Sequence, residues 1–342
     1  MTLCELSLAL PGRLLPWYGS HARDLPWRQD RQPYHILLSE IMLQQTRVEA
    51  VRAYYLRFLD RLPTIEALAE ADEQTLLKLW EGLGYYSRVR NLQMAARAIV
   101  AAGGFPTSRE GLLALPGVGA YTAGAVGSIC FDLPTPAVDG NVLRVMTRLA
   151  AIDTPITSAA LRREITAALA AAYPAGRCGT FTQALMELGA TVCGPGGAPD
   201  CALCPVADLC ACADGRWKNI PVRPAKKARR REEYTVLILR CGERIALQKR
   251  PDTGLLAGLW ELPNRPGRLD AQGAMDWAVS LGVQPQRLLR QLTRRHIFTH
   301  VEWQLHGYEF LCGQAAPPLQ WQPAREAALP TAFRILLDRD DD

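Results

Sequence analysis

Apolar and polar positions alternate at helical spacing along the first 215 residues. In residues 34–59, apolar side chains recur every three or four positions, as on one face of an amphipathic helix. Prolines and glycines such as Pro63, Gly84 and Pro155 separate this segment from similar ones. The spacing predicts an all-α domain over residues 1–215, with further helices over 64–79, 88–101, 109–115, 121–130, 141–152, 159–172 and 180–192.

The residue pattern changes after residue 231. Short segments rich in β-branched and aromatic residues replace the helical spacing, and residues 274–281 between them predict a helix. We therefore expect a basic linker over residues 216–233 and a separate α+β domain over residues 234–342. Strands of that domain are predicted over residues 234–240 and 244–249, and residues 296–311 are β-rich.

The positive charge of the chain is concentrated in one short segment. The 39 lysines and arginines exceed the 34 aspartates and glutamates by five. Residues 223–231, with the sequence RPAKKARRR, hold six basic and no acidic residues, whereas residues 1–222 hold 20 of each. Such a run is typical of a solvated linker or of a strip that follows phosphates, and one segment can be both.

The chain carries no signal for a membrane or for secretion. No apolar run approaches the roughly 18–20 residues that span a bilayer. The N-terminus contains Glu5 and has neither a basic region nor a small-residue cleavage site, so we expect an intracellular protein.

Four of the ten cysteines lie within 18 residues, which favours a metal site over disulfides. They form the pattern C-x7-C-x2-C-x5-C at Cys193, Cys201, Cys204 and Cys210. Four thiolates at this spacing can surround one zinc ion or one iron–sulfur cluster, and the spacing does not separate the two. The nearby Cys212 is a possible substitute ligand.

A glycine-rich turn at residues 115–119, with the sequence LPGVG, lies between two predicted helices near residues 109–130. Gly117 and Gly119 allow the backbone to approach a partner closely, and the N–H groups of the following helix can bind a phosphate without reading sequence. An ordinary helix–turn–helix corner has the same pattern.

Two carboxylates stand in contrasting settings. Glu40 lies on a predicted helix among apolar neighbours, which raise a carboxyl pKa and favour a general acid. Asp139 precedes the helix expected from Asn141, where the helix N-terminus favours the ionised form. One acid and one anion suit cleavage through an oxocarbenium-like state. An N-cap at Asp139 and a merely paired polar group at Glu40 would produce the same pattern.

Together with the four cysteines, five motifs resemble the MutY adenine DNA glycosylases, which share the helix-hairpin-helix superfamily with endonuclease III. The resemblance runs from about Leu25 to the C-terminus, and its combination of motifs is highly specific. It implies a multidomain fold, with an all-α helix-hairpin-helix glycosylase domain that carries an iron–sulfur cluster loop and a C-terminal α+β nudix-like domain. The motifs are SEIMLQQTRV (39–48), GLGYYSRVRNL (82–92), LPGVGAYTAGA (115–125), VDGNVLRV (138–145) and GLWELP (258–263).

The resemblance implies a role for each matching residue. Glu40 matches the acid that protonates adenine N7, and Asp139 matches the carboxylate that stabilises the sugar cation. Asn141 and Tyr121 match residues that position these two groups. Bifunctional relatives carry a nucleophilic lysine at the position of Tyr121, so we expect base excision without efficient strand cleavage. The pocket for the extruded adenine is matched by Trp27, Arg28, Leu43 and Glu187.

The resemblance also implies residues that examine the base opposite the adenine, usually 8-oxoguanine. One set probes the partner base within the duplex, and one of Tyr85 and Tyr86 is expected in the core. The sequence Phe298-Thr299-His300 matches a Phe-Ser-His loop that contacts the oxidised guanine, with a methyl group added at Thr299. The probing residues are matched by Gln45, Thr46, Leu83 and Tyr85.

The nudix-like domain is expected to recognise and not to hydrolyse. A hydrolytic nudix box needs a REuxEExGu helix (u aliphatic) whose glutamates hold Mg²⁺, and residues 267–283 lack it. For the cysteines the resemblance implies a [4Fe-4S] cluster in a loop over residues 193–210. The first cysteine gap has seven residues where the family usually has six, and its glycines and prolines accommodate the extra residue.

The combined interpretation is a monomeric glycosylase that acts on double-stranded DNA with adenine opposite 8-oxoguanine or guanine. One alternative is a bifunctional endonuclease-III-like lyase, against which Tyr121 and the second domain argue. Another is a non-catalytic iron–sulfur DNA-binding protein, against which the intact Glu40 and Asp139 argue. Nudix nucleotide hydrolysis is a third, disfavoured by the missing glutamates.

Overall fold

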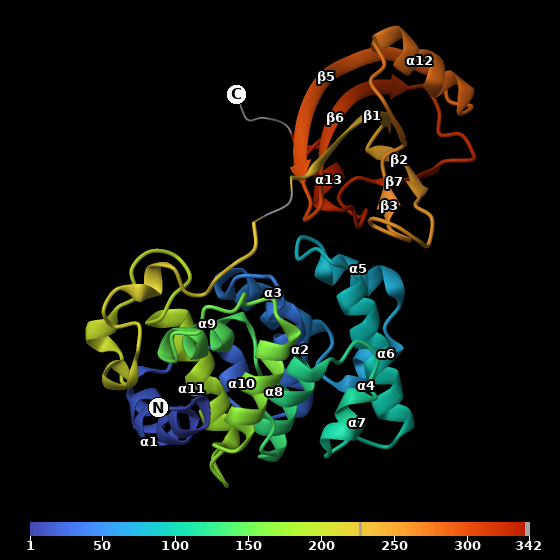
Figure 1. Cartoon of the computed structure of the whole chain (residues 1–342). Helices are drawn as coiled ribbons and strands as arrows, with labels where there is room; N and C mark the ends of the chain where they lie inside the picture. Colours follow the sequence, from blue (N-terminus) through green and yellow to red (C-terminus); the bar gives the residue numbers. More distant parts are fainter. Residues whose placement is uncertain (226–227, 339–342) are drawn as a thin grey trace. The chain divides into compact units, whose positions relative to one another are not determined.

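The computed structural model of the chain describes residues 1–225 and 228–338, so Lys226 and Lys227 of the basic run lie outside the described residues (Figure 1). The chain divides into two compact units. The first contains Met1–Ala71 and Ser87–Ala225, and the second contains Asp72–Tyr86 and Lys226–Asp342. Within the described part of the chain, no helix has the length and apolar character that crossing a membrane requires.

The first unit is helical, as the sequence predicts. The helix predicted over residues 64–79 is wrong as a single element, because one helix ends at Glu70 and the next begins at Glu73. Three short 3-10 helices, Pro26–Arg28, Cys201–Leu203 and Arg216–Lys218, lie among its loops, with a fourth at Ala207–Leu209. Its α-helices are α1 (Leu3–His21), α2 (Pro33–Leu43), α3 (Val48–Arg61), α4 (Ile65–Glu70), α6 (Ser87–Ala101), α7 (Arg109–Leu113), α8 (Ala120–Phe131), α9 (Gly140–Leu149), α10 (Ala159–Ala170) and α11 (Cys178–Thr191).

Helices α1, α9, α10 and α11 share one hydrophobic core. Leu14, Met146, Ile165 and Phe181, one from each helix, are fully buried in it. Burying a side chain of this size stabilises the fold by about 1.5–3 kcal/mol. The first helix, α1, begins with a capping box in which the Glu5 amide donates to the Thr2 hydroxyl. This core fixes α9 and α11, which carry much of the candidate site.

The long helix pattern predicted over residues 34–59 is interrupted, and this part of the prediction is wrong. A turn at Gln44–Arg47 separates α2 from α3, and Gln45 adopts a left-handed conformation with φ of 61°. The carbonyls of Ile41, Met42 and Gln44 at the end of α2 accept hydrogen bonds from Arg88 Nη1 at 2.6–3.1 Å. A helix end needs partners for its last carbonyls. Here a residue more than 40 positions away supplies them, which local periodicity does not reveal.

The second unit contains a seven-stranded mixed sheet with the strand order β3-β2-β1-β6-β5. Strands β1 and β6 are parallel, the other pairs are antiparallel, β4 pairs with β1, and β7 pairs with β2. One core holds α13 against the sheet and another holds α12. The elements are α5 (Glu73–Trp80), β1 (Arg230–Cys241), β2 (Arg244–Lys249), β3 (Trp260–Glu261), β4 (Asn264–Pro266), α12 (Ala271–Ser280), β5 (Pro285–Ile297), β6 (Val301–Cys312), β7 (Gln320–Pro323) and α13 (Thr331–Arg334).

Two strand boundaries differ from the sequence prediction. Strand β1 begins at Arg230, inside the segment predicted as linker, because its first residues pair with β6 and Glu232 accepts a hydrogen bond from Trp303 at 2.9 Å. Strand β5 extends from Pro285, whereas the predicted strand region begins at residue 296. Few of its residues are of the β-branched and aromatic types that are enriched in strands, so pairing with β6 determines its conformation. The predicted second strand and the helix before β5 are both present.

Candidate active site

A cavity of about 170 Å³ opens in the helical unit, between residues of α2, α8, α9 and α11 and of the loop before α2. Predicted site residues that lie as much as 160 positions apart in the sequence line this one cavity. The predicted residues that line the cavity are Trp27, Arg28, Glu40, Leu43, Thr46, Tyr121, Asp139, Asn141 and Glu187.

Glu40 lies on α2 and is 6% exposed. The Tyr121 hydroxyl on α8 donates a hydrogen bond to Glu40 Oε2 at 2.5 Å. Burial raises the pKa of Glu40 to about 7; the hydrogen bond from Tyr121 opposes the rise and the charge of Asp139 adds to it. Burial also raises the pKa of Tyr121 well above its usual range, so the phenol stays protonated. A carboxyl group that titrates near neutral pH can act as a general acid.

Asp139 is the N-cap of α9, as the sequence predicts. Its carboxylate accepts hydrogen bonds from the Val142 amide at 2.7 Å and from Asn141 Nδ2 at 2.8 Å. Burial nevertheless raises the pKa of Asp139, against the lowering effect of these bonds and of the Arg144 charge. The helix N-terminus favours the anion, as expected, but it does not outweigh desolvation. The two carboxyl groups thus line the same cavity, Glu40 buried and Asp139 half-buried, and they differ in their hydrogen-bond donors.

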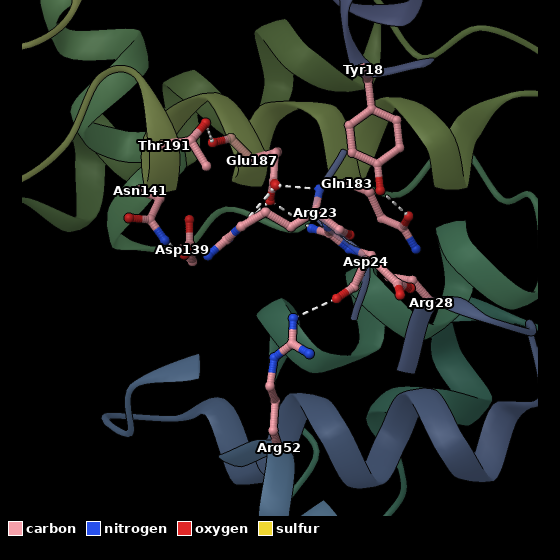
Figure 2. Close-up of polar contacts among 10 residues, drawn as sticks. All are labelled: Tyr18, Arg23, Asp24, Arg28, Arg52, Asp139, Asn141, Gln183, Glu187 and Thr191. Carbon is pink, nitrogen blue, oxygen red and sulfur yellow. Dashed lines mark hydrogen bonds and ion pairs between the residues drawn. The ribbon is translucent and has the colours of Figure 1, made fainter. Parts of the chain in front are cut away.

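Glu187, on α11, has a fully buried carboxylate that is held by two arginines (Figure 2). Its Oε1 accepts from the amide and Nε of Arg23, and its Oε2 accepts from Arg23 Nη2 and Arg28 Nη2, at 2.8–2.9 Å. Burial opposes ionisation, but the bonds from Arg23 and Arg28 prevail and lower the pKa of Glu187 to about 2. Four donors occupy the lone pairs of the two oxygens. Glu187 therefore holds Arg23 and Arg28 in place at the cavity wall.

Sequence reasoning missed several residues of the cavity wall. Arg23, Gln183 and Met186 line it together with the predicted residues. Gln183 stands four positions before Glu187 on α11, so both lie on the same helix face. That spacing was a signal available in the sequence. Arg23 carried no such signal, because its loop reaches Glu187 only through the tertiary fold.

The predicted hairpin is formed by α7, a turn and α8. Gly117 has φ of 72°, and a Cβ there would lie 2.5 Å from the Asn91 side chain, so the turn requires glycine. Gly119 is extended, with open space where a Cβ would be, and no side chain caps the start of α8. The first-turn N–H groups of α8 therefore receive no cap from the N-cap residue, which is a glycine.

The four predicted cysteine ligands line one small cavity of about 30 Å³, together with Cys212. Arg148 Nη1 donates a hydrogen bond to Cys193 Sγ at 3.3 Å, as it would to a thiolate. Burial and the neighbouring thiols raise the pKa of Cys204 to about 11, so a thiolate there needs a cation beside it. Among residues 1–225 and 228–338, no three His, Cys, Asp or Glu side chains converge closely enough to hold a single metal ion.

The residues predicted to examine the partner base lie in loops. Gln45 and Thr46 form the turn after α2, whereas Leu83 is buried after α5. Tyr85 is 47% exposed and its neighbour Tyr86 is buried, which agrees with the expectation that one of the two belongs to the core.

In the loop between β5 and β6, Phe298 packs edge-on against His296 and Trp303, and Thr299 and His300 are exposed. Within the second unit the hydroxyls of Tyr85 and Thr299 form a hydrogen bond. The predicted probing residue Tyr85 and the predicted recognition loop are thus in contact.

Comparison with known families identifies the class of protein. Residues 38–170 match the HhH-GPD superfamily of base excision DNA repair proteins, and residues 234–339 match the NUDIX domain. The helical unit is similar to a thermostable thymine-DNA glycosylase, with a TM-score of 0.53 and 27% identity over 60% of this chain and 96% of that chain. Endonuclease III in a trapped covalent DNA intermediate has the same fold, with a TM-score of 0.53 and 24% identity over 63% of this chain and 99% of that chain. The chain thus has the fold of a base excision repair glycosylase, followed by a nudix-like domain.

Full-length relatives narrow the class to one family. The adenine DNA glycosylase of Rattus norvegicus is 35% identical over 94% of this chain and 76% of its own length. The proteins of the same name from Mus musculus and Homo sapiens are 37% and 35% identical over 95% of this chain, and over 76% and 73% of their own lengths. The chain belongs to the adenine DNA glycosylase family. The resemblance to MutY-type enzymes and the two-part fold are confirmed.

Proposed function

We propose that the protein hydrolyses the N-glycosidic bond of adenine that is mispaired with 8-oxoguanine or guanine in double-stranded DNA, leaving an abasic site. One observation carries this proposal. Glu40 and Asp139 line the same cavity, and burial raises the pKa of Glu40 to about 7. A buried acid and a carboxylate on one cavity suit an oxocarbenium-like transition state. Because the bond is inaccessible inside a duplex, the adenine must be extruded into the cavity.

Glu40 acts as the general acid. Tyr121 donates to Oε2, which leaves Oε1 to carry the proton. That proton passes to adenine N7, the C1′–N9 bond breaks, and its electron pair leaves with the base. General acid catalysis of this kind contributes roughly 10²–10⁴-fold to the rate.

Asp139 stabilises the cation that forms on the sugar. Hydrogen bonds from Asn141 and Val142 hold its carboxylate and favour the anion. A water oxygen then bonds to C1′, and the proton that this water loses returns to the Glu40 carboxylate. The sum of these steps is hydrolysis, with adenine and an abasic site as products.

The enzyme is proposed to be monofunctional. Tyr121 occupies the position at which bifunctional relatives carry lysine, and its hydroxyl is bound to Glu40. A phenol cannot form a Schiff base with the sugar. Borohydride treatment during the reaction should therefore capture no covalent protein–DNA complex, and efficient capture would contradict this assignment.

Contacts to DNA are proposed for the hairpin and the loops. The uncapped N-terminus of α8 after Gly119 can bind a backbone phosphate, since its N–H groups and helix dipole favour an anion. Gln45, Thr46, Leu83 and Tyr85 examine the partner base. Tyr85 is hydrogen-bonded to Thr299 of the Phe298–His300 loop, which supports a shared role for the two segments.

The nudix-like domain is proposed to recognise the oxidised base without hydrolysing nucleotides. Its Glu261 is held by Gln248 at 2.8 Å and by Arg250, and the segment 267–283 lacks the glutamates that bind Mg²⁺ in hydrolases. Release of pyrophosphate from 8-oxo-dGTP by the protein would overturn this point.

A [4Fe-4S] cluster is proposed at Cys193, Cys201, Cys204 and Cys210. These four thiols line one cavity, and thiolate donors suit such a cluster. When bound, the cluster would fix the loop after α11; hydrolysis itself needs no metal. Analysis should find iron and acid-labile sulfide in equal amounts, and zinc in their place would contradict the assignment.

The experiment that tests the proposed function is single-turnover cleavage of three duplexes, with adenine opposite 8-oxoguanine, guanine or thymine. Each reaction is scored before and after alkali. Strand breaks that appear only after alkali, fastest on the 8-oxoguanine duplex, are expected. If a folded and metal-loaded protein releases adenine from none of them, the proposed function is wrong.

A further inference from the structure

Within the second unit, a cluster of charges joins α5 to the C-terminal segment of the chain. Glu81 directly follows α5, and its Oε1 accepts hydrogen bonds from Nη2 of Arg334 on α13 and from Nε of the same guanidinium at 3.0 Å. Its Oε2 accepts from Lys78 Nζ at 2.7 Å, and this ammonium group also donates to the carbonyl of Arg325 at 3.0 Å. The cluster therefore connects two segments that are about 250 positions apart in the sequence.

The ion pair at the centre of this cluster is half-buried. The side chain of Glu81 is 19% exposed and that of Arg334 is 27% exposed. The guanidinium also donates to the carbonyls of Ala324, at 3.1 Å, and Ala327. Because a guanidinium is planar and its donors are fixed in one fork, these bonds determine the direction in which it meets Glu81. Partial burial also protects the pair from screening by salt.

The α13 end of the cluster packs toward the predicted recognition loop. Phe333, the residue before Arg334, is fully buried, and its ring centroid lies 6.1 Å from that of Trp303 on β6. The other neighbour of Trp303 is Phe298, at 4.8 Å between centroids. Packed aromatic side chains with buried rings transmit a displacement, because a core has few voids to absorb it. The position of Arg334 is thus linked to the position of the loop that begins at Phe298.

The α5 end of the cluster carries Tyr85, four positions after Glu81. Tyr85 has φ of 47°, a left-handed conformation that a non-glycine residue adopts only where its surroundings hold it. Its hydroxyl forms a hydrogen bond with that of Thr299. The ion pair and this hydrogen bond are two separate connections between the same two segments, and two connections fix a separation that one would leave free to vary.

We propose that Glu81 and Arg334 are positioning residues for discrimination of the partner base: their ion pair holds Tyr85 and the Phe298–His300 loop at a fixed separation, so that both meet an 8-oxoguanine together. This inference rests on the proposed function, in which the nudix-like domain recognises the oxidised base. Neither residue has to touch DNA. Without the pair, the two segments would have to be ordered on binding, which weakens recognition of the oxidised base.

The test compares two partner bases opposite the same adenine. Single-turnover rates of adenine release are measured opposite 8-oxoguanine and opposite guanine, with enzyme in excess of DNA but below saturation, so that each rate includes binding. The ratio of the two rates is the readout. Glu81→Met removes both carboxylate oxygens at similar volume. The ratio should fall by about 3- to 5-fold, the upper part of the range for a partly exposed ion pair. The rate opposite guanine should stay unchanged.

A double-mutant cycle tests whether the effect belongs to the pair. Arg334→Met should lower the ratio by a similar factor, and combining it with Glu81→Met should lower the ratio no further, because the pair is already broken. Arg325→Met is the matched control. It removes a cation from the same segment, but this side chain is 79% exposed and pairs with Glu326, and the backbone carbonyl that Lys78 contacts remains. Its ratio should equal that of the wild type.

Each other outcome has a defined meaning. An unchanged ratio in folded Glu81→Met overturns the inference, and so does an equal fall of both rates, which would show a general structural effect. A fall that Glu81→Met still causes in the Arg334→Met background overturns it as well. If Glu81→Met does not fold, Arg334→Met alone decides by the same criteria. Failure of the wild type to release adenine, or to prefer the 8-oxoguanine duplex, would instead contradict the proposed function, so the two failures are distinguishable.

Discussion

Glu40 and Glu187 line the same cavity and both are buried, yet their pKa values move in opposite directions, to about 7 and to about 2. The difference lies in their partners. Glu40 receives one hydrogen bond from the neutral phenol of Tyr121, whereas Glu187 receives four from Arg23 and Arg28. Desolvation raises a carboxyl pKa in both places, and only charged donors reverse it. One end of the cavity is thus suited to donate a proton and the other to fix two cations.

The strongest test of this contrast is the loss of the acid. Glu40→Gln keeps the size of the side chain and can still accept from Tyr121, but it has no proton to give. We expect single-turnover adenine release to fall by about 10³-fold, within the range for a general acid, with DNA affinity largely kept. Glu164→Gln, at an exposed position on α10, is the matched control. Near wild-type excision by Glu40→Gln would refute the assignment.

Replacing Glu187, at the opposite end of the cavity, should lower the stability of the fold. Glu187→Gln leaves two guanidinium groups without their anion, and removing one partner of a buried pair costs about 3–5 kcal/mol. Arg23 is 32% and Arg28 13% exposed, so water offsets part of this loss. We expect the free energy of unfolding at pH 7 to fall by about 3 kcal/mol, measured by urea denaturation.

The pH dependence of that loss has a definite sign. The pKa of Glu187 is lowered from 4.5 to about 2 on folding, so its contribution is complete above pH 4.5 and disappears as the pH falls toward 2. The gap between wild type and Glu187→Gln should therefore narrow below pH 4.5. A gap that stays constant to pH 3 would show that the carboxylate charge is not its source.

The contribution of Glu40 to stability should depend on pH in the opposite direction. The pKa of Glu40 is raised from 4.5 to about 7 on folding, so the protonated form of this side chain stabilises the folded state. This stabilisation is complete below pH 4.5 and is lost as the pH rises through 7. We expect Glu40→Gln to be more stable than wild type by about 3 kcal/mol at pH 8.5, with the difference vanishing toward pH 4.5. Thermal unfolding across this range measures it. The excision rate of the wild type should fall over the same interval above pH 7, and a rate that keeps rising there would contradict the acid role.

Two residues of the cavity were predictable from local signals, and the other predicted residues that line it were predicted only through the family resemblance. Asp139 precedes a helix and caps it, and Glu40 has apolar neighbours at helical spacing. The pKa of Asp139 was not predictable in this way, since its burial depends on how α9 packs in the folded unit. Arg23 was missed for the same reason, since only the tertiary fold brings its loop to Glu187.

The fold shows the same division between local and long-range information. The pattern predicts helices and the first two strands well, because their residue types match local propensity. It fails at Gln44–Arg47, where a distant arginine caps the helix end, and along β5, where the neighbouring strand determines the conformation. Local periodicity does not predict elements that are stabilised by residues distant in the sequence.

Arg88 extends the comparison to a cation that donates to backbone carbonyls. Arg88→Met fills similar volume but leaves the carbonyls of Ile41, Met42 and Gln44 without their donor. We expect a loss of about 1–2 kcal/mol in the free energy of unfolding, less than for Glu187→Gln, because neutral acceptors bind more weakly than anions. Arg163→Met, at an exposed position on α10, should change it by less than about 0.5 kcal/mol. Equal losses in the two variants would mean that Arg88 does not hold the turn.

The smallest expected effect concerns arginines outside the cavity. Arg23 and Arg28 are committed to Glu187, whereas Arg223 and Arg229 of the basic run are exposed. If both contact phosphates, replacing them by glutamine should make the plot of log affinity against log salt less steep by about 2, since each contact to duplex DNA adds about 0.9 to the slope. The same replacement at the exposed Arg163 and Arg177 gives the same net charge and should leave the slope unchanged. Equal slopes in the two double variants would make the run a linker only, and the charges that bind DNA would then have to lie elsewhere on the chain.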